Sequence, residues 1–326
     1  YYTGQATYGD MNMHLAFITS IARQGTFPPE YSILPGNRIC YPFLCDSISS
    51  SIYLWGSSLR LAYILPMAVA FMQVMSGIYL LAKYLLGDGR KAVVTWILFF
   101  FNGGLGILYF LGKGSDNFQR IFTEFYQTPT NYVDENVRWA NTLVDMLLPQ
   151  RATLFGWAVL FPVVLLVAKG IRDRQKCYLV LSGILVGGLP MIHTHSFVAM
   201  AFIGAVWLLG SVWANCRPEW MNQRPVSGKY VFLGVFVLFN VISLLTEYGD
   251  TEISEKIYYG MAISAGGLMM LLCLWTAWKG WHHKEGKQCL ILWGIFLGMV
   301  LLLALPQLFQ WTFRQAQGNQ FLRGGF

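Results

Sequence analysis

Long runs of apolar residues, separated by short polar connections, cover most of the chain beyond residue 60. Each run approaches the roughly 20 residues that a helix needs to cross the hydrocarbon core of a bilayer. The pattern predicts an all-α fold, a polytopic membrane helical bundle of about eight spans. We place the spans at Leu61–Leu86, Ala92–Gly112, Ala152–Ala168, Cys177–Ile192, Ser196–Trp213, Tyr230–Leu245, Ile257–Trp278 and Cys289–Leu305.

The polar segments between these runs contain shorter helical patterns. Residues 10–24 carry apolar side chains at a spacing of three to four, and Gly25 and the Pro28-Pro29 pair end the pattern. This is typical of an amphipathic helix lying in the membrane interface, with Asp10 as its N-cap. We expect three further helices in outer loops, at Asp46–Trp55, Asn117–Tyr126 and Glu135–Leu148.

The same pattern divides the chain into three parts. Residues 1–60 form an outer loop with an interfacial helix, residues 61–305 form the transmembrane bundle with the outer loop 113–151 inserted, and residues 306–326 form an outer C-terminal segment. The sequence starts at Tyr1 with neither an initiator Met nor a signal-like apolar stretch. We therefore expect a further span before Tyr1 that doubles as a signal anchor, and a longer chain after Phe326.

Composition supports a membrane protein. Hydrophobic residues make up 55% of the 326, charged residues only 12%, and the mean hydropathy is +0.47. A soluble domain carries roughly twice as much charge, which excludes an ordinary globular protein.

Lys and Arg are sorted between the two sets of loops. One set of short connections holds thirteen of the 23 Lys and Arg residues but only four of the 16 acids. The positive-inside rule places this set in the cytoplasm, so the net charge of +7 reflects topology and needs no nucleic-acid partner. We predict a multi-pass plasma-membrane protein whose segments 1–60, 113–151, 193–195, 246–256 and 306–326 face outward.

Cys40 and Cys45 both lie on the predicted outer side, five positions apart. They form either a disulfide, as an oxidising compartment permits, or two free thiols. The other four cysteines lie in or near spans and resemble small apolar residues.

The pair Asp10 and His14 is the first candidate site. The two residues are one helical turn apart in Tyr8-Gly9-Asp10-Met11-Asn12-Met13-His14, so they share a face of the predicted interfacial helix. Asp10 is the candidate general base, which would deprotonate an acceptor hydroxyl or amine. His14 would orient Asp10, bind a phosphate oxygen or share a metal. The alternatives are an N-cap for Asp10 and a polar helix face for His14.

The outer turn Pro190-Met191-Ile192-His193-Thr194-His195-Ser196 is the second candidate site. His193 and His195 are candidates for binding substrate phosphate, and with Asp10 and His14 they would supply a divalent-metal site. Imidazoles with a carboxylate suit Zn²⁺ or Mn²⁺, whereas Mg²⁺ prefers oxygen ligands. The alternative is that both histidines cap helices, and no cofactor is required by the pattern.

Arg151 begins the third predicted span on its outer side, after Leu148-Pro149-Gln150. A guanidinium offers donors in a fixed fork that matches a phosphate, so we predict a phosphate-binding role. Anchoring to lipid headgroups is the alternative. Arg138 is a weaker candidate for the same role.

The segments YGDMNMH, YPFLCDSISSSI, LPQRATLFG and PMIHTHSF resemble those of bacterial members of the GT-C superfamily of membrane glycosyltransferases. The resemblance implies transfer of a sugar from a polyprenyl-phosphate-linked donor to a glycan, lipid or protein acceptor on the outer face. It also implies that Asp10 corresponds to the catalytic first-loop Asp and Arg151 to a residue contacting donor phosphate. The chain departs from the frequent Asp-Glu or Asp-x-Asp pair, because it has Asp10 with His14.

Two other classes of function remain open at this point. A transporter or lipid flippase would place charges near the bilayer midplane, whereas the predicted spans are nearly free of charge. A metal-dependent membrane hydrolase or phosphotransferase would use the histidines and Asp10 as ligands.

Overall fold

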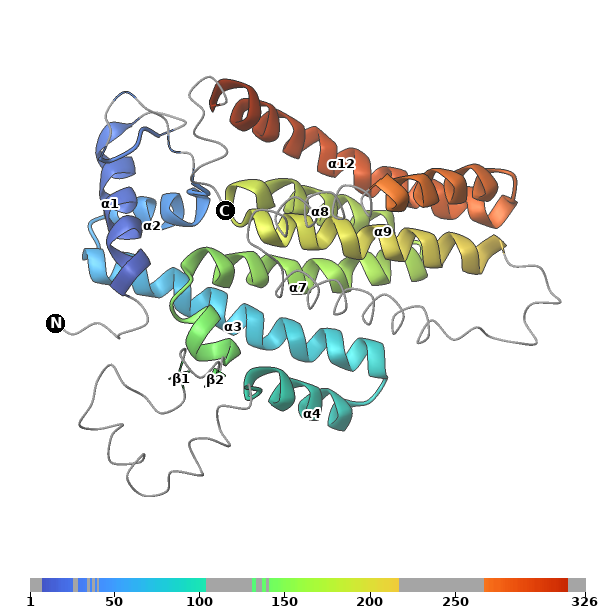
Figure 1. Ribbon diagram of the computed structural model, residues 1–326, viewed down its shortest axis with the longest axis horizontal. Helices are drawn as coiled ribbons and strands as arrows, with labels where there is room; N and C mark the ends of the chain where they lie inside the picture. The colour runs from blue at the N-terminus through green and yellow to red at the C-terminus, as the bar shows by residue number, and fades with distance from the viewer. Residues whose placement is uncertain are drawn as a thin grey trace. The chain divides into compact units, whose positions relative to one another are not determined.

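The computed structural model describes residues 8–25, 29–33, 36, 39, 41–103, 131, 132, 137, 138, 141–216 and 267–315. Apart from two two-residue strands, the regular elements of this part are helices (Figure 1). They are α1 (Tyr8–Gln24), α2 (Leu44–Leu54), α3 (Leu59–Leu86), α4 (Gly89–Phe100), β1 (Asn131–Tyr132), β2 (Val137–Arg138), the π-helix η3 (Thr142–Leu147), α7 (Arg151–Arg172), α8 (Lys176–Gly188), the 3-10 helix η4 (Leu189–Met191), α9 (Thr194–Cys216), a helix over 267–281, and α12 (Lys284–Gln315).

Four of the described helices are long and apolar enough to cross a membrane. They are Leu59–Leu86, Arg151–Arg172, Thr194–Asn215 and Lys284–Gln307, and each contains one of the predicted spans. The predicted span Cys177–Ile192 corresponds to a shorter apolar helix, Lys176–Met191. The chain is therefore helical and compatible with a membrane protein.

The other three predicted spans are matched less fully. Helix α4 (Gly89–Phe100) covers the first half of the predicted span Ala92–Gly112, and residues 104–112 of that span lie outside the described residues. The span Tyr230–Leu245 lies outside the described residues, and Ile257–Trp278 is described only from residue 267, where a helix runs to residue 281.

The chain divides into two compact units. The first comprises Tyr1–Ala168, Ser182–Val198 and Met299–Phe326, and the second comprises Lys169–Leu181 and Ala199–Gly298. The first unit thus draws on all three of the parts expected from the sequence.

Helices α3 and α4 form a hairpin whose ends follow from local sequence. Ser58 caps α3, its hydroxyl accepting a hydrogen bond from the Leu61 amide at 3.2 Å. Gly87 ends α3 with φ 68°, a left-handed conformation that glycine adopts without a steric penalty. Asp88 then caps α4 through the Arg90 amide at 2.7 Å.

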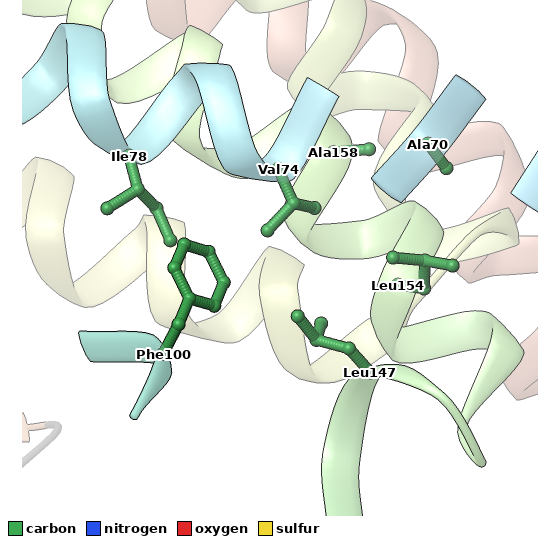
Figure 2. Close-up of a cluster of buried hydrophobic side chains, with 7 residues drawn as sticks. All are labelled: Ala70, Val74, Ile78, Phe100, Leu147, Leu154 and Ala158. Atoms are coloured by element: carbon green, nitrogen blue, oxygen red, sulfur yellow. The ribbon is translucent and has the colours of Figure 1, made fainter. Parts of the chain in front are cut away.

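The apolar core of the first unit lies where α3, α4, η3 and α7 meet. Its buried side chains converge in Figure 2: Ala70, Val74, Ile78, Phe100, Leu147, Leu154 and Ala158. A Cβ at Gly77 would lie 3.1 Å from the Phe161 Cβ, so the glycine lets α3 and α7 approach closely. This packing holds α3 against the first turns of α7, which begins with Arg151 of the candidate site.

Inside the second unit, α9 and α12 are joined by side-chain bonds. The Trp293 indole donates to the Ser211 hydroxyl at 2.8 Å, and Trp293 is buried. Arg174 and Glu285 form an ion pair on the surface of this unit.

The short helices predicted outside the spans are found in part. Helices α1 and α2 confirm the helices expected at 10–24 and Asp46–Trp55. However, α1 begins at Tyr8, so Asp10 lies in its first turn and is not the N-cap. The predicted helix Asn117–Tyr126 lies outside the described residues.

The continuous helix predicted at Glu135–Leu148 is wrong. Val137–Arg138 pairs as a strand with Asn131–Tyr132, and a π-helix begins only after Asn141. The Asn141 carboxamide oxygen accepts from the amides of Leu143 and Val144, and its nitrogen donates to the Phe100 carbonyl at 3.0 Å. This capping residue starts a new helix, an effect that periodicity alone does not reveal.

Candidate functional site

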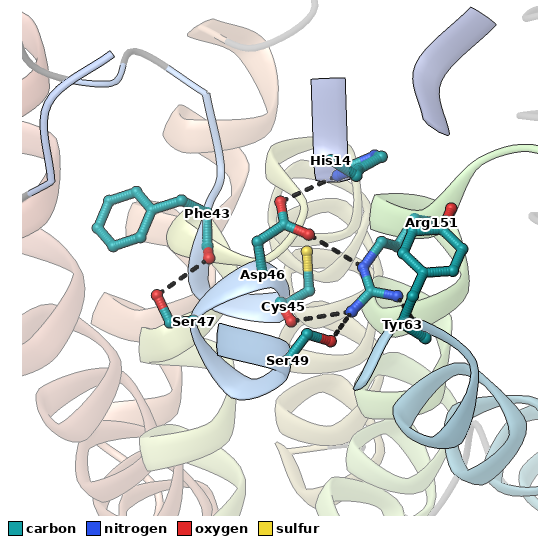
Figure 3. A network of polar contacts seen from close by, with 8 residues as sticks. All are labelled: His14, Phe43, Cys45, Asp46, Ser47, Ser49, Tyr63 and Arg151. Atoms are coloured by element: carbon teal, nitrogen blue, oxygen red, sulfur yellow. Dashed lines mark hydrogen bonds and ion pairs between the residues drawn. The ribbon is translucent and has the colours of Figure 1, made fainter. Parts of the chain in front are cut away.

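Asp46 is the centre of a buried polar network that joins three helices (Figure 3). Its Oδ2 accepts a hydrogen bond from Nδ1 of His14 in α1 at 2.9 Å. Its Oδ1 accepts from Nε of Arg151, the first residue of α7, at 3.0 Å. His14, Asp46 and Arg151 are all at most 1% exposed. A carboxylate offers only acceptors, so His14 carries its proton on Nδ1.

The guanidinium of Arg151 is bound on all sides by protein groups. Nη1 donates to the Tyr63 carbonyl at 3.0 Å, and Nη2 donates to the Cys45 carbonyl at 3.1 Å and to the Ser49 hydroxyl. The rings of Tyr63 and Phe155 lie 4.7 and 4.9 Å from its Cζ. The three atoms Nε, Nη1 and Nη2 are therefore all engaged.

This geometry does not support the predicted phosphate-binding role of Arg151. The prediction assumed an exposed fork at the top of the span, but the side chain is 0% exposed and points to Asp46. Nothing in its sequence neighbourhood identifies Asp46 as the partner, because the two residues are 105 positions apart.

The network contains one ion pair and one buried thiol. The Asp46 carboxylate faces the Arg151 guanidinium, and burial raises the pKa of the neighbouring Cys45 thiol, which therefore stays protonated. One atom is left over: Nε2 of His14 is buried and has no hydrogen-bond partner.

His14, Cys45 and Asp46 bring three ligand-type atoms within 4.8 Å of one another. In the described part of the chain they form the one such group of three, and of the predicted ligands Asp10, His14, His193 and His195 it contains His14 alone. The predicted four do not assemble. The group itself suits a dication poorly, because Asp46 already balances Arg151 and Cys45 is a protonated thiol.

Asp10 lies on α1 one turn before His14, but its carboxylate is exposed. The predicted pairing of the two is not the one that forms, since the Nδ1 of His14 is bonded to Asp46. Burial raises the pKa of Tyr41, and the negative charges of Asp10 and Asp46 raise it further. The Asp10 carboxylate thus acts electrostatically on Tyr41.

His193 belongs to a separate cluster. The Thr153 hydroxyl donates to Gln150 Oε1 at 2.8 Å and lies 3.3 Å from Nε2 of His193. Ser196 Oγ lies 2.8 Å from its Nδ1. Burial, aided by the charge of His195, lowers the pKa of His193 to about 4, so this imidazole is neutral at ordinary pH.

The remaining predicted site residues are less constrained. His195 is exposed, with its ring centroid 5.2 Å from that of His193. Arg138 lies in β2 opposite Asn131, and its side chain is outside the description. The structure thus brings His14 and Arg151 together through Asp46, and groups His193 with Thr153 and Ser196.

Sequence reasoning did not single out three residues of the network: Asp46, which it counted only among several acids that could assist, Ser49 and Tyr63. Asp46 gave one signal, because it is an acid in an otherwise apolar and Ser-rich helix. An acid buried in such a helix requires a cationic or hydrogen-bonding partner, but the sequence does not say which one. Comparison with protein-family models, with curated proteins and with solved structures gives no match.

Proposed function

We propose that this chain is an integral membrane glycosyltransferase of GT-C type. It transfers a sugar from a polyprenyl-phosphate-linked donor to an acceptor on the non-cytoplasmic face, with Asp10 as general base. One observation carries the proposal: Asp10 presents an exposed carboxylate on a helix that the buried His14–Asp46–Arg151 network fastens to the beginnings of the long apolar helices.

The sidedness of this site is supported by two helices independently. Tyr63, which Arg151 contacts, lies near the start of α3, whereas Lys83 lies in its last turn. Arg151 is the first residue of α7, whereas Lys169 and Arg172 lie in its last turn. The positive-inside rule assigns the Lys- and Arg-rich ends to the cytoplasm. With the eight spans proposed from the sequence, Asp10 faces outward at the membrane surface.

The proposed reaction inverts the configuration at the anomeric carbon of the transferred sugar. Asp10 takes the proton of an acceptor hydroxyl or amine as the acceptor heteroatom bonds to that carbon, and the bond from carbon to the lipid phosphate oxygen breaks. The lipid phosphate leaves with the bonding electrons. Because Arg151 is already bound inside the protein, the exposed His195 is the candidate to face the leaving phosphate.

The position of the charges favours an enzyme over a transporter. The pair of Asp46 and Arg151 lies at helix ends, whereas transporters keep coupling charges and broken helices near the bilayer midplane. Each of the four long apolar helices contains an 18-residue window with at most two charged residues. The polarity thus gathers at the membrane surface, where a lipid-linked donor carries its sugar.

The proposal is tested by sugar transfer in proteoliposomes that contain the full chain. The probes are undecaprenyl-phosphate hexoses and pentoses with a radiolabelled sugar, and the native membrane fraction supplies acceptors. We expect transfer by the wild type and a loss of at least about 100-fold in Asp10→Asn, the usual contribution of a general base. Asn12→Ala, also exposed on α1, is the matched control and keeps the wild-type rate. Absence of transfer from every donor, or an active Asp10→Asn, contradicts the proposal.

A further inference from the structure

We propose that Asp46 is a positioning residue, which holds the catalytic carboxylate of Asp10 in place through His14 and Arg151. This inference rests on the proposed function, because it explains how an exposed side chain near the start of the chain keeps a fixed position. The three residues of the network do not touch substrate; they act through the placement of α1.

Apolar contacts alone define the position of α1 loosely. Its buried Phe17 packs in a cluster with Ile39 and Phe43, which precede α2. Such contacts are non-directional, so they hold the helix against its neighbours without fixing its rotation or its sliding. The directional bond of α1 to this network is the one from His14 to Asp46.

The bonds from Asp46 continue to the long helices. Asp46 binds Arg151 of α7, and Arg151 in turn binds the Tyr63 carbonyl of α3 and the Cys45 carbonyl of α2. Asp10 and His14 are four positions apart in one helix, which places their Cβ atoms about 6 Å apart on the same side. A fixed His14 therefore fixes the carboxylate of Asp10 relative to α3 and α7.

The composition of the network indicates a role in geometry more than in stability. A buried ion pair gains little over well-packed apolar side chains, because both charges lose their hydration. His14 adds a further cost, since its Nε2 is buried without a partner. An apolar residue at position 14 would avoid this cost but would give up the directional bond. Catalysis requires such directional placement, because small displacements of a base reduce the rate strongly.

The test compares two substitutions of His14 that both leave Asp46 paired with Arg151. His14→Leu removes the bond to Asp46, whereas the side-chain amide of His14→Gln donates to the same carboxylate. We expect kcat for sugar transfer to fall at least tenfold in His14→Leu, with KM for the lipid-linked donor changed less than threefold. His14→Gln restores kcat to within about threefold of the wild type.

Hydrogen–deuterium exchange of peptides from residues 8–24 is the second readout and needs no activity. We expect faster exchange in His14→Leu than in the wild type and near-wild-type exchange in His14→Gln. Asp46→Glu, which keeps the charge but lengthens the side chain, serves if His14→Leu does not fold, and its kcat falls while KM is retained.

The outcomes separate the two proposals. If the folded His14→Leu or Asp46→Glu protein keeps the wild-type kcat, Asp46 does not position Asp10 and the inference is overturned. The inference is overturned as well if α1 exchanges at the wild-type rate in both His14→Leu and Asp46→Glu. If exchange responds as expected but the wild type transfers no sugar, the anchoring of α1 holds and the proposed function fails.

Discussion

Removing one partner of the buried pair formed by Asp46 and Arg151 gives the sharpest stability prediction. Both side chains are 0% exposed, and their atoms are 3.0 Å apart. Asp46→Leu leaves a guanidinium buried without a counter-charge, and Arg151→Met leaves a carboxylate in the same situation. We expect each single substitution to lower the free energy of unfolding by about 3–5 kcal/mol.

The double substitution Asp46→Leu/Arg151→Met removes both charges together and is expected to cost less than either single change. The carbonyls of Tyr63 and Cys45 lose a donor, but both belong to helices whose own backbone bonds remain. The hydrogen bond of His14 to Asp46 is lost, at about 1 kcal/mol. In the double variant, folding no longer incurs the cost of removing two charges from water. This gain offsets the losses, so the net change in the free energy of unfolding stays within about 2 kcal/mol.

The assay is equilibrium unfolding in mixed micelles with increasing SDS, followed by circular dichroism on all four proteins of the cycle. The wild type and the three variants are compared at the same detergent concentration. Additive effects, with the double variant as unstable as the two singles combined, would refute a directly coupled buried pair.

Three further predictions concern packing, pH and thiol reactivity. Gly156→Ala places a Cβ 2.5 Å from the Cβ of His193 and should lower the free energy of unfolding by about 1–3 kcal/mol. The control Gly188→Ala meets open space and should change it by less than about 1 kcal/mol. Equal effects of the two substitutions in unfolding experiments would argue against this packing. The pKa of His193 is lowered from 6.5 to about 4, so between these pH values the unfolded chain binds a proton that the folded chain does not. Stability therefore falls as the pH drops from about 6.5 towards 4. Unfolding measured over a pH series should show this fall in the wild type and a smaller one in His193→Gln. Maleimide should label the exposed Cys177 and leave the buried Cys45 unmodified until the protein unfolds, as peptide mass spectrometry can show; early labelling of Cys45 would contradict its burial.

The helices were accessible to prediction because their signals are local. The apolar runs at Leu61–Leu86 and Ser196–Trp213 recur within a few residues as α3 and α9. Helix α1 likewise follows from apolar spacing and from the stop at Gly25. The break near Asn141 was missed, because a single capping side chain overrode a weak helical period.

The candidate site was accessible only in part, because its bonds join residues far apart in sequence. Asp10 and His14 were selected for their spacing of one helical turn. In the fold, however, His14 forms its hydrogen bond with Asp46, 32 positions away. Arg151 was selected as a cation at the start of a span, and it is the first residue of α7. Its role differs from the predicted one, because its guanidinium is buried in an ion pair with Asp46 and does not bind a phosphate from solution.

The central claim is that Asp10 acts as the base on the non-cytoplasmic face. The most direct measurement is the rate of sugar transfer in sealed membrane vesicles of defined orientation, comparing Asp10→Asn with Asp88→Asn. The second substitution makes the same chemical change at the start of α4, on the proposed cytoplasmic side, and keeps a side chain that caps a helix well. The account predicts a loss of at least about 100-fold in Asp10→Asn and a wild-type rate in Asp88→Asn, with transfer confined to donor supplied on the outer face. A wild-type rate in Asp10→Asn, or transfer from the cytoplasmic face, would contradict it.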